Sequence, residues 1–226
     1  MRGEIDMKIS YVRGLEEEGA KFWLSRVGWE PGEAAERIAQ ENDPEEAGYV
    51  ADIGGGHGRD ALWLAERHFR SILIEPNRYS LRFAKGRAKN RRLNVGLINA
   101  TLPYLPLCSE TVDVVDLYWT LHQIPDEHKL ESLKEIYRVL KPKGTLYSAS
   151  FGYWEGQEMP RSIHPIIEKQ AFLNLHVSAG FKPRCKIKKR SDRTSSFEKF
   201  WYGIFQKISD SAQGRTCGGS YVLPCC

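Results

Sequence analysis

The stretch that decides the fold is "YVADIGGGHGRD", residues Tyr49 to Asp60. An apolar run over residues 49–53 is followed by four glycines within positions 54–58, and then by a helical pattern. Glycine loses more conformational freedom on folding than any other residue, so such a run is costly to order. A strand, a glycine turn and a helix in this order let backbone N–H groups approach a ligand closely. The stretch therefore predicts a ligand-binding turn at a strand end.

Apolar, β-branched runs alternate with helical patterns on both sides of this turn. The expected strands are residues 49–53, 71–75, 94–99, 112–119 and 145–151, and the expected helices between them are residues 59–68, 78–91 and 127–140. A further helix at 163–179 and strands at 181–188 and 198–206 follow. This alternation is typical of βαβ units with right-handed crossovers. It predicts an α/β, doubly wound, Rossmann-like fold around a mostly parallel sheet.

One domain accounts for residues 1–207, because a chain of 226 residues with 41% apolar content can bury one sizeable core. Residues 15–27 and 31–40 have helical patterns and precede the first strand. We expect residues 1–47 to form a helical cover over the open edge of the sheet. The Gly/Ser-rich tail at 208–226 has no periodicity and is expected to be disordered.

The charge is nearly balanced, with 33 Lys and Arg against 29 Asp and Glu and a net charge of +4. This balance does not by itself indicate a nucleic-acid-binding protein. Basic residues nevertheless gather in residues 82–92 and 182–193. A solvated helix face or a lysine-protected strand edge explains such runs more often than a polyanion site does. RNA or another polyanion is the alternative partner for these two basic segments.

The N-terminal residues "MRGEIDMKIS" are charged and contain no apolar run. No window of the sequence is long and apolar enough to span a bilayer, so we expect a cytoplasmic protein without membrane contact. Of five cysteines, Cys108 and Cys185 fall inside the domain and the others in the tail. None has a C-x-x-C spacing with nearby histidines, so the sequence predicts reduced thiols and no metal site.

Two cofactor classes use a glycine turn of this kind. A dinucleotide site needs G-x-G-x-x-G, and counted from Gly54 its third glycine falls on Arg59. Asp52 stands two residues before Gly54, where a carboxylate would repel a pyrophosphate and suits a cationic ligand. Glu75 ends the second strand, where a carboxylate can accept from both hydroxyls of a ribose. An amine, a ribose and close backbone contact together indicate S-adenosylmethionine and disfavour a nicotinamide cofactor.

Residues 49–151 resemble the class I S-adenosylmethionine-dependent methyltransferases, of the small ubiquinone-biosynthesis-like (methyltransferase type 11) kind. Four stretches in register carry the resemblance: "VADIGGGHG", "LIEPN", "LPLCSETVDVVDLYWTLHQIPD" and "EIYRVLKPKGTL". The resemblance implies a seven-stranded sheet with an antiparallel C-terminal hairpin, and S-adenosyl-L-methionine as the cofactor.

The resemblance also assigns expected roles to individual residues. Asp52 would face the methionine end of the cofactor, Gly54 and Gly56 would lie against it, and Glu75 would hold its ribose. The full set of expected cofactor contacts is Asp52, Gly54, Gly55, Gly56, Gly58, Glu75, Pro76, Asn99, Ala100 and Leu117.

Two positions depart from the family pattern. Asn99 stands where the family usually has an acid that takes the adenine amino group, and an amide oxygen can accept from that amine. Thr101 is the other candidate for this role. Asp116 lies inside the fourth expected strand, where the family usually has an apolar residue. A buried acid needs a partner or a shifted pKa, and we expect a structural role for it.

Methyl transfer depends mainly on aligning acceptor, methyl and sulfur, so no catalytic triad is expected. Because ligands bind outside the carboxyl ends of parallel strands, the expected mouth residues are Tyr118, Trp119, His122, Tyr153 and Trp154. Tyr118 and His122 are the catalytic candidates, the latter as a base, although packing or capping is the simpler role for a histidine here. His57 is expected to touch the cofactor.

These residues predict a methyltransferase that modifies a small molecule, a protein or an RNA by in-line displacement. The alternative is a module that binds the cofactor and activates a partner without turnover. The presence of Asp52, the glycines and Glu75 argues against a decayed cofactor pocket.

Overall fold

The computed structural model describes residues 17–26, 29–151, 167–185, 188–190 and 200–208. Two expected mouth residues, Tyr153 and Trp154, lie outside these ranges, as does the tail from residue 209. The expected disorder of the tail therefore stays a prediction, as does the extent of the single domain.

A mixed sheet with strand order β3-β2-β1-β4-β5-β8-β6 forms the centre of the molecule, and β7 also pairs with β8. The strands are β1 (Tyr49–Ile53), β2 (Arg70–Ile74), β3 (Gly96–Ile98), β4 (Val112–Tyr118), β5 (Leu140–Phe151), β6 (Phe181–Pro183), β7 (Lys188–Arg190) and β8 (Phe200–Lys207). The first five strands are parallel, whereas β8 runs antiparallel to β5, β6 and β7. Since β6 and β7 are two pieces of the strand expected at 181–188, the prediction of a seven-stranded sheet with an antiparallel terminal hairpin is confirmed.

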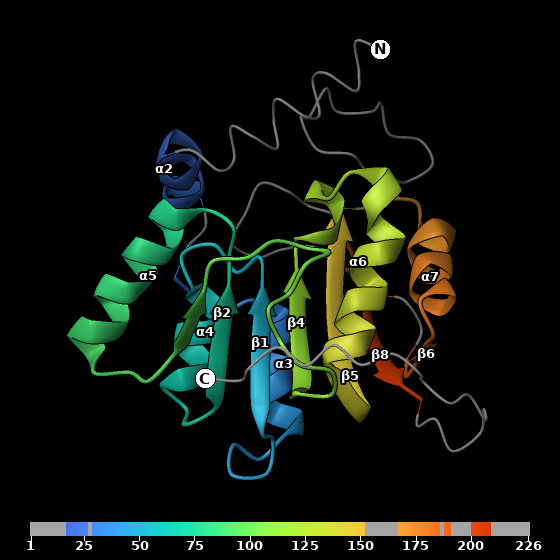
Figure 1. The fold of residues 1–226 in the computed structure, drawn as a ribbon, viewed down its shortest axis with the longest axis horizontal. Helices are drawn as coiled ribbons and strands as arrows, with labels where there is room; N and C mark the ends of the chain where they lie inside the picture. The colour runs from blue at the N-terminus through green and yellow to red at the C-terminus, as the bar shows by residue number, and fades with distance from the viewer. Residues whose placement is uncertain (1–16, 27–28, 152–166, 186–187, 191–199, 209–226) are drawn as a thin grey trace.

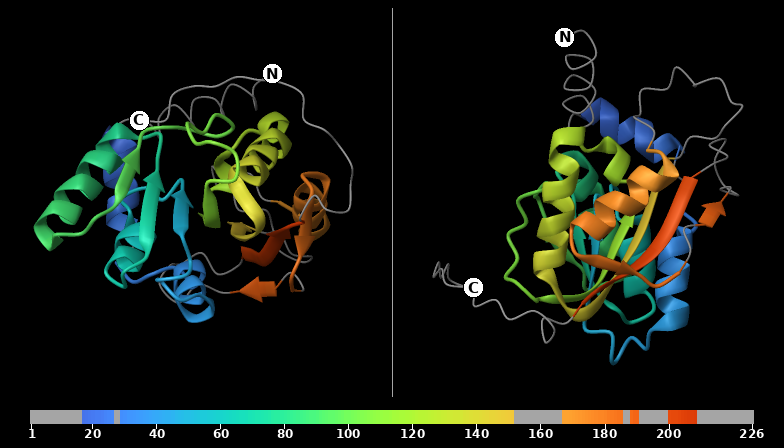
Figure 2. Two further views of the ribbon diagram at one scale, coloured as in Figure 1. Left: turned by 60° about the horizontal axis from the view of Figure 1, so that its bottom comes forward. Right: turned by 90° about the vertical axis from the view of Figure 1, so that its right-hand side faces the viewer.

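Helices cover both faces of this sheet. They are α2 (Glu17–Arg26), α3 (Glu33–Glu41), α4 (Arg59–Ala65), α5 (Arg78–Arg91), the 3-10 helix η1 (Leu121–Gln123), α6 (Asp126–Val139) and α7 (Lys169–Ser178). The sheet separates α6 and α7 from α3, as the right panel of Figure 2 shows. The chain is therefore doubly wound, as predicted.

The side chains of β4 point alternately to the two faces of the sheet, and both faces are buried. Val115 and Leu117 pack in the core beneath α6 and α7, whereas Val114 packs beneath α3. Successive side chains of a strand point to opposite faces, so one strand serves both layers. Burying each large apolar side chain stabilises the fold by about 1.5–3 kcal/mol.

Helix α3, part of the segment 1–47 that was expected to cover the open edge of the sheet, packs on a face of the sheet instead. Helix α3 buries Ala34, Ala35 and Ile38 against the face of the sheet that carries Val50 and Tyr147. Its short apolar stripe matches the apolar side of the central strands, so packing on that face buries more surface than packing on an edge. Helix α2 instead contacts α5 and lies above it, at the carboxyl end of the strands (Figure 1).

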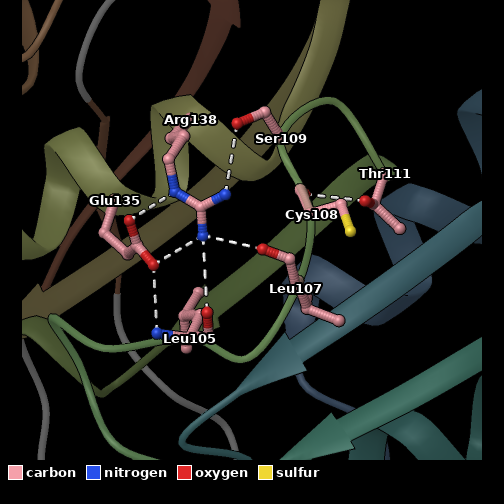
Figure 3. Close-up of polar contacts among 7 residues, drawn as sticks. All are labelled: Leu105, Leu107, Cys108, Ser109, Thr111, Glu135 and Arg138. Atoms are coloured by element: carbon pink, nitrogen blue, oxygen red, sulfur yellow. Dashed lines mark hydrogen bonds and ion pairs between the residues drawn. The ribbon is translucent and has the colours of Figure 1, made fainter. Parts of the chain in front are cut away.

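Two of the stretches that carry the family resemblance are joined by one arginine (Figure 3). Arg138 of α6 makes a bidentate ion pair with Glu135, through Nε and Nη2, both at 2.7 Å. Its Nη2 also donates to the carbonyl of Leu107 at 2.8 Å, and Glu135 accepts from the N–H of Leu105 at 3.0 Å. This network fixes the loop that leads into β4, so Leu105, Leu107, Glu135 and Arg138 serve the fold.

The two basic segments lie at opposite edges of the sheet. Residues 82–91 belong to α5, which packs beside β3, and residues 182–183 belong to β6 at the other end of the strand order. Whether either segment binds a polyanion stays a prediction. None of the helices in the described part of the chain is long and apolar enough to cross a membrane.

Candidate functional site

A cleft opens at the carboxyl ends of β1, β2 and β4, where open parallel sheets bind ligands. Residues that were expected to contact a cofactor or to line the mouth meet in it. They are Asp52, Gly54, Gly55, Gly56, His57, Glu75, Tyr118, Trp119 and His122. The structure therefore brings most of the expected site together in one place.

The glycines of the turn differ in what an added side chain would contact. A Cβ on Gly54, whose φ is 73°, would lie 2.4 Å from Oγ1 of Thr120, and one on Gly55 would lie 2.2 Å from the Asp52 carboxylate. A Cβ on Gly56, whose φ is 54°, would meet nothing within 4 Å. Packing within the protein therefore excludes side chains at Gly54 and Gly55, and only at Gly56 does the bare backbone face open space.

Glu75 ties the glycine turn to the end of β2. Its Oε2 accepts from the N–H of Gly56 at 2.9 Å, and its Oε1 accepts from the N–H of Asn77 at 2.8 Å. Burial raises the pKa of Glu75, while these two N–H donors lower it. A carboxylate has about four acceptor positions, so two remain for hydroxyl groups of a ligand. The residue lines the cleft, as the ribose role requires.

Asn77 was not among the expected site residues. Its side-chain oxygen caps α5 by accepting from the N–H groups of Tyr79 and Ser80, at 2.9 and 3.1 Å. Such a cap stabilises a helix by about 1 kcal/mol. An asparagine directly before a helical pattern is a sequence signal for a helix N-cap, and it would have placed Asn77 at this strand end.

Asp52 is buried at the base of the cleft. Its Oδ2 accepts from the N–H of Ala61 at 3.1 Å. Burial, followed by the charge of Asp60, raises the pKa of Asp52 to about 8, against the lowering effects of the Ala61 N–H and of Arg59. A cationic ligand would reverse this effect, because it stabilises the ionised carboxylate.

Asp116 lies beside Asp52 in the β1–β4 ladder and is fully buried. No described group makes a hydrogen bond of good geometry to either of its carboxylate oxygens. Burial and the charges of Asp60 and Asp52 raise its pKa well above the ordinary value, and Arg59 and the N–H of Tyr118 only partly oppose this. Because Asp116 does not reach the cleft surface, its placement fits the expected structural role.

Arg59 and Asp60, at the start of α4, complete the charged floor of the cleft. Nε and Nη2 of Arg59 donate to the two carboxylate oxygens of Asp60, at 2.9 and 3.0 Å. Asp60 also accepts from the N–H of Gly32 at 2.8 Å, which joins α4 to the segment before α3. From the sequence, Arg59 served only to exclude a dinucleotide, and Asp60 was missed because its partner Gly32 lies 28 residues earlier in the chain.

Aromatic residues form part of the cleft wall. The rings of Tyr118 and Trp119 stack at 5.3 Å with an interplanar angle of 14°. Trp29, which also lines the cleft, stacks on Phe83 at 5.9 Å, and the guanidinium of Arg87 lies 3.3 Å from the centre of the Trp29 ring. Arg87 belongs to the first basic segment, so at least one cation of that segment has a role in packing.

The remaining expected cofactor contacts lie outside the cleft lining. They are Gly58, Pro76, Asn99, Ala100 and Leu117. Leu117 is fully buried in the core beneath α6, and the Asn99 amide nitrogen donates to the carbonyls of Glu75 and Pro76, at 2.9 and 2.8 Å. The hydroxyl of Thr101, the other candidate for the adenine, donates to the carbonyl of Leu102 at 3.2 Å. Contacts of these residues with a cofactor stay predictions.

Comparison with known proteins supports a common origin for the central part of the chain. A family profile described as a methyltransferase domain matches residues 50–144. The ubiquinone/menaquinone biosynthesis C-methyltransferase UbiE of Rickettsia prowazekii is 31% identical over 110 residues, which cover 45% of this chain and 44% of UbiE. UbiE of Blochmanniella floridana is 29% identical over 119 residues, covering 50% of this chain and 46% of that relative. The matches thus span less than half the length of these curated relatives.

Solved structures share the fold at lower identity. The 1,6-didemethyltoxoflavin-N1-methyltransferase of Burkholderia thailandensis, solved with 1,6-didemethyltoxoflavin and S-adenosylhomocysteine, has a TM-score of 0.70 and 15% identity, covering 91% of this chain and 89% of that one. An S-adenosylmethionine-dependent methyltransferase of Methanosarcina mazei has a TM-score of 0.65 and 21% identity, covering 76% and 97%. Residues 50–144, with their glycine turn and matching stretches, therefore form a methyltransferase domain of the class I S-adenosylmethionine-dependent type.

Proposed function

We propose that this protein transfers the methyl group of S-adenosylmethionine to a small, planar acceptor that binds against the aromatic wall of the cleft. The observation that carries the proposal is the position of the stacked Tyr118–Trp119 pair, which lines the same cleft as the glycine turn. Flat aromatic side chains bind flat ligands through stacking at little entropic cost.

The residues of the cleft fit the donor. Gly56 leaves open space where the donor must lie against the backbone, Glu75 has acceptor positions for the ribose, and Asp52 suits the amino group. When bound, S-adenosylmethionine supplies a methyl carbon that its sulfonium activates for attack. The protein must then hold the acceptor in line and keep water out.

The aromatic end of the cleft can perform these tasks. Tyr118 and Trp119 would orient the acceptor ring, and Trp29, which also lines the cleft, would help to exclude water. His122 also lines this end, and imidazole is the side chain most often used to take a proton in catalysis. His122 would serve as a base only for acceptors that must lose a proton before attack.

The charged residues of the cleft lining indicate which net charge the acceptor carries. Among the described residues that line the cleft, Asp52, Asp60 and Glu75 are acidic and Arg59 is the single Lys or Arg. An excess of carboxylates repels an anionic acceptor such as a phosphate ester. We therefore favour a neutral or cationic ring. The similar proteins include a ubiquinone/menaquinone biosynthesis C-methyltransferase and an N-methyltransferase solved with 1,6-didemethyltoxoflavin.

The test combines binding with transfer. Isothermal titration with S-adenosylhomocysteine comes first, and a panel of planar quinols, phenols and heterocyclic amines is then incubated with labelled donor. Trp119→Ala should raise the KM for the accepted ring about tenfold and change donor affinity by less than about twofold. Tyr49→Ala, which removes an exposed ring at the start of β1, serves as the control. Donor binding without transfer to any acceptor would favour the module that activates a partner.

A further inference from the structure

Arg59 has an unusual position among the charges of the cleft. It is the single Lys or Arg in the described cleft lining, and it lies beside Asp60 and within electrostatic reach of Asp52 and Asp116. The methionine part of the donor carries two opposite charges, an α-ammonium and an α-carboxylate. The acidic residues of the cleft suit the ammonium, but they repel the carboxylate. A donor that lies across this floor therefore needs one cation, and Arg59 can provide it.

The geometry of Arg59 leaves part of its guanidinium available. The pairing with Asp60 uses Nε and one N–H of Nη2, which lie on one edge of the group. A guanidinium has five N–H donors, so this pairing leaves three, and two of these, one on Nη1 and one on Nη2, lie on the neighbouring edge. A second carboxylate can be bound there with two parallel hydrogen bonds.

The surroundings of Arg59 hold it in place and keep it charged. Asp60 is buried and is itself fixed by the N–H of Gly32, while the guanidinium lies 5.6 Å from the centre of the Tyr118 ring. Asp60, Tyr118 and Asp116 raise the pKa of Arg59 against the effect of burial. The group is therefore a fixed positive charge, and little side-chain entropy remains to be lost when a ligand binds.

Asp52 and Arg59 line the same cleft and interact electrostatically. The Asp52 carboxylate accepts from the N–H of Ala61, two residues after Arg59. We propose that Arg59 binds the α-carboxylate of the donor's methionine part, while Asp52 faces its α-ammonium group. The assignment depends on donor binding, which the proposed function also requires.

The test uses two ligands that differ only in the carboxylate: S-adenosylhomocysteine and its decarboxylated analogue. We expect Arg59→Gln to weaken S-adenosylhomocysteine binding about 10- to 100-fold, because a charge-assisted hydrogen bond is lost, and to change the affinity for the decarboxylated analogue by less than about twofold. Arg59→Lys keeps the charge but loses the two-pronged geometry, so its loss should be intermediate. Isothermal titration gives both affinities, and circular dichroism confirms that each variant is folded.

Arg67→Gln is the matched control, because Arg67 follows the same helix but packs on the ring of Trp63 away from the cleft. It should bind both ligands as the wild type does. Equal losses of both ligands in Arg59→Gln and Arg59→Lys would show that Arg59 only supports Asp60 and Gly32, and would overturn the assignment; so would unchanged affinity for S-adenosylhomocysteine. If Arg59→Gln does not fold, Arg59→Lys decides alone. A wild-type protein that binds neither ligand would instead refute the proposed function.

Discussion

Two turns at neighbouring strand ends use opposite kinds of residue. The glycine turn, residues 54–58 after β1, has almost no side chains, whereas the aromatic turn, residues 118–123 at the end of β4, carries Tyr118, Trp119 and His122. The first exposes backbone at Gly56, and the second presents flat rings at the same cleft. The contrast suggests a division of the cleft into a donor end and an acceptor end.

The two turns also depend on each other. The hydroxyl of Thr120 in the aromatic turn donates to the carbonyl of Ile53 at 3.0 Å, and its side chain occupies the space that a Cβ on Gly54 would need. The side chain of Thr120 in the aromatic turn is therefore one reason why position 54 of the glycine turn has no side chain. A substitution at their contact should affect stability, whereas one on the cleft surface should affect binding.

The largest expected effect is on the free energy of unfolding, and it distinguishes Gly54, which packs against Thr120, from Gly56, which faces open space. Gly54→Ala should lower the free energy of unfolding by about 2–4 kcal/mol, because it combines a positive φ with a clash against Thr120. Gly56→Ala has the positive φ but no clash, and should lower it by about 1–2 kcal/mol. Urea denaturation measures both.

Adding Thr120→Ala to Gly54→Ala should restore part of the lost stability, because it removes the two closest atoms of the clash. Equal destabilisation by the two glycine substitutions, with no recovery in the double variant, would mean that the turns are independent.

A second prediction concerns the carboxylate that holds the glycine turn. Glu75→Gln removes a charged acceptor from the N–H groups of Gly56 and Asn77, and we expect donor affinity to fall about 10- to 100-fold in a calorimetric titration. Glu75→Ala should abolish measurable binding while the fold persists. Glu66→Gln, which alters a surface ion pair with Arg91, is the control. Unchanged affinity in both Glu75 variants would remove this residue from the donor site.

A third prediction uses the raised pKa of Asp52. Burial raises this pKa from 3.8 to about 8, so between these pH values the native state holds a proton that the unfolded chain has lost. Stability must then fall as pH rises through this window. Asp52→Asn removes the titration, so its Tm should exceed that of the wild type at pH 8, and the difference should disappear near pH 4. A constant difference across this range would mean that Asp52 titrates normally.

The smallest expected effect lies on the outer surface of α5. Lys85→Glu with Lys89→Glu reverses two exposed charges of the first basic segment, away from both turns. We expect the transfer rate to a small acceptor to stay within about twofold of the wild-type rate, since neither side chain lines the cleft. An RNA acceptor would give a different result, namely weaker binding and a salt dependence reduced by about two charges.

Much of the fold was predictable because its signals are local. Helix α5 and strand β1 begin and end at the expected residues. The capping Asn77 marks the start of α5, and the glycine turn marks the end of β1. The positions of Asp52 and Glu75 followed from their places at strand ends. These features depend on neighbours within a few residues, which sequence patterns record well.

Other features depended on contacts between distant segments. The role of Arg59 requires Asp60 and the N–H of Gly32, 28 residues before Asp60, and the Cβ clash at Gly54 requires Thr120. The position of α3 on a face of the sheet was missed for the same reason. No periodicity within one segment carries information about which distant surface it will cover.

By itself, the sequence determined the α/β class, the positions of the central strands and the type of donor, because hydrophobic alternation and turn chemistry act over short distances along the chain. Only the tertiary structure decided which glycine faces the cleft, which arginine is held there and where the N-terminal helices pack. Those choices depend on close packing and on charges brought together by folding, and both arise from residues that are remote in sequence.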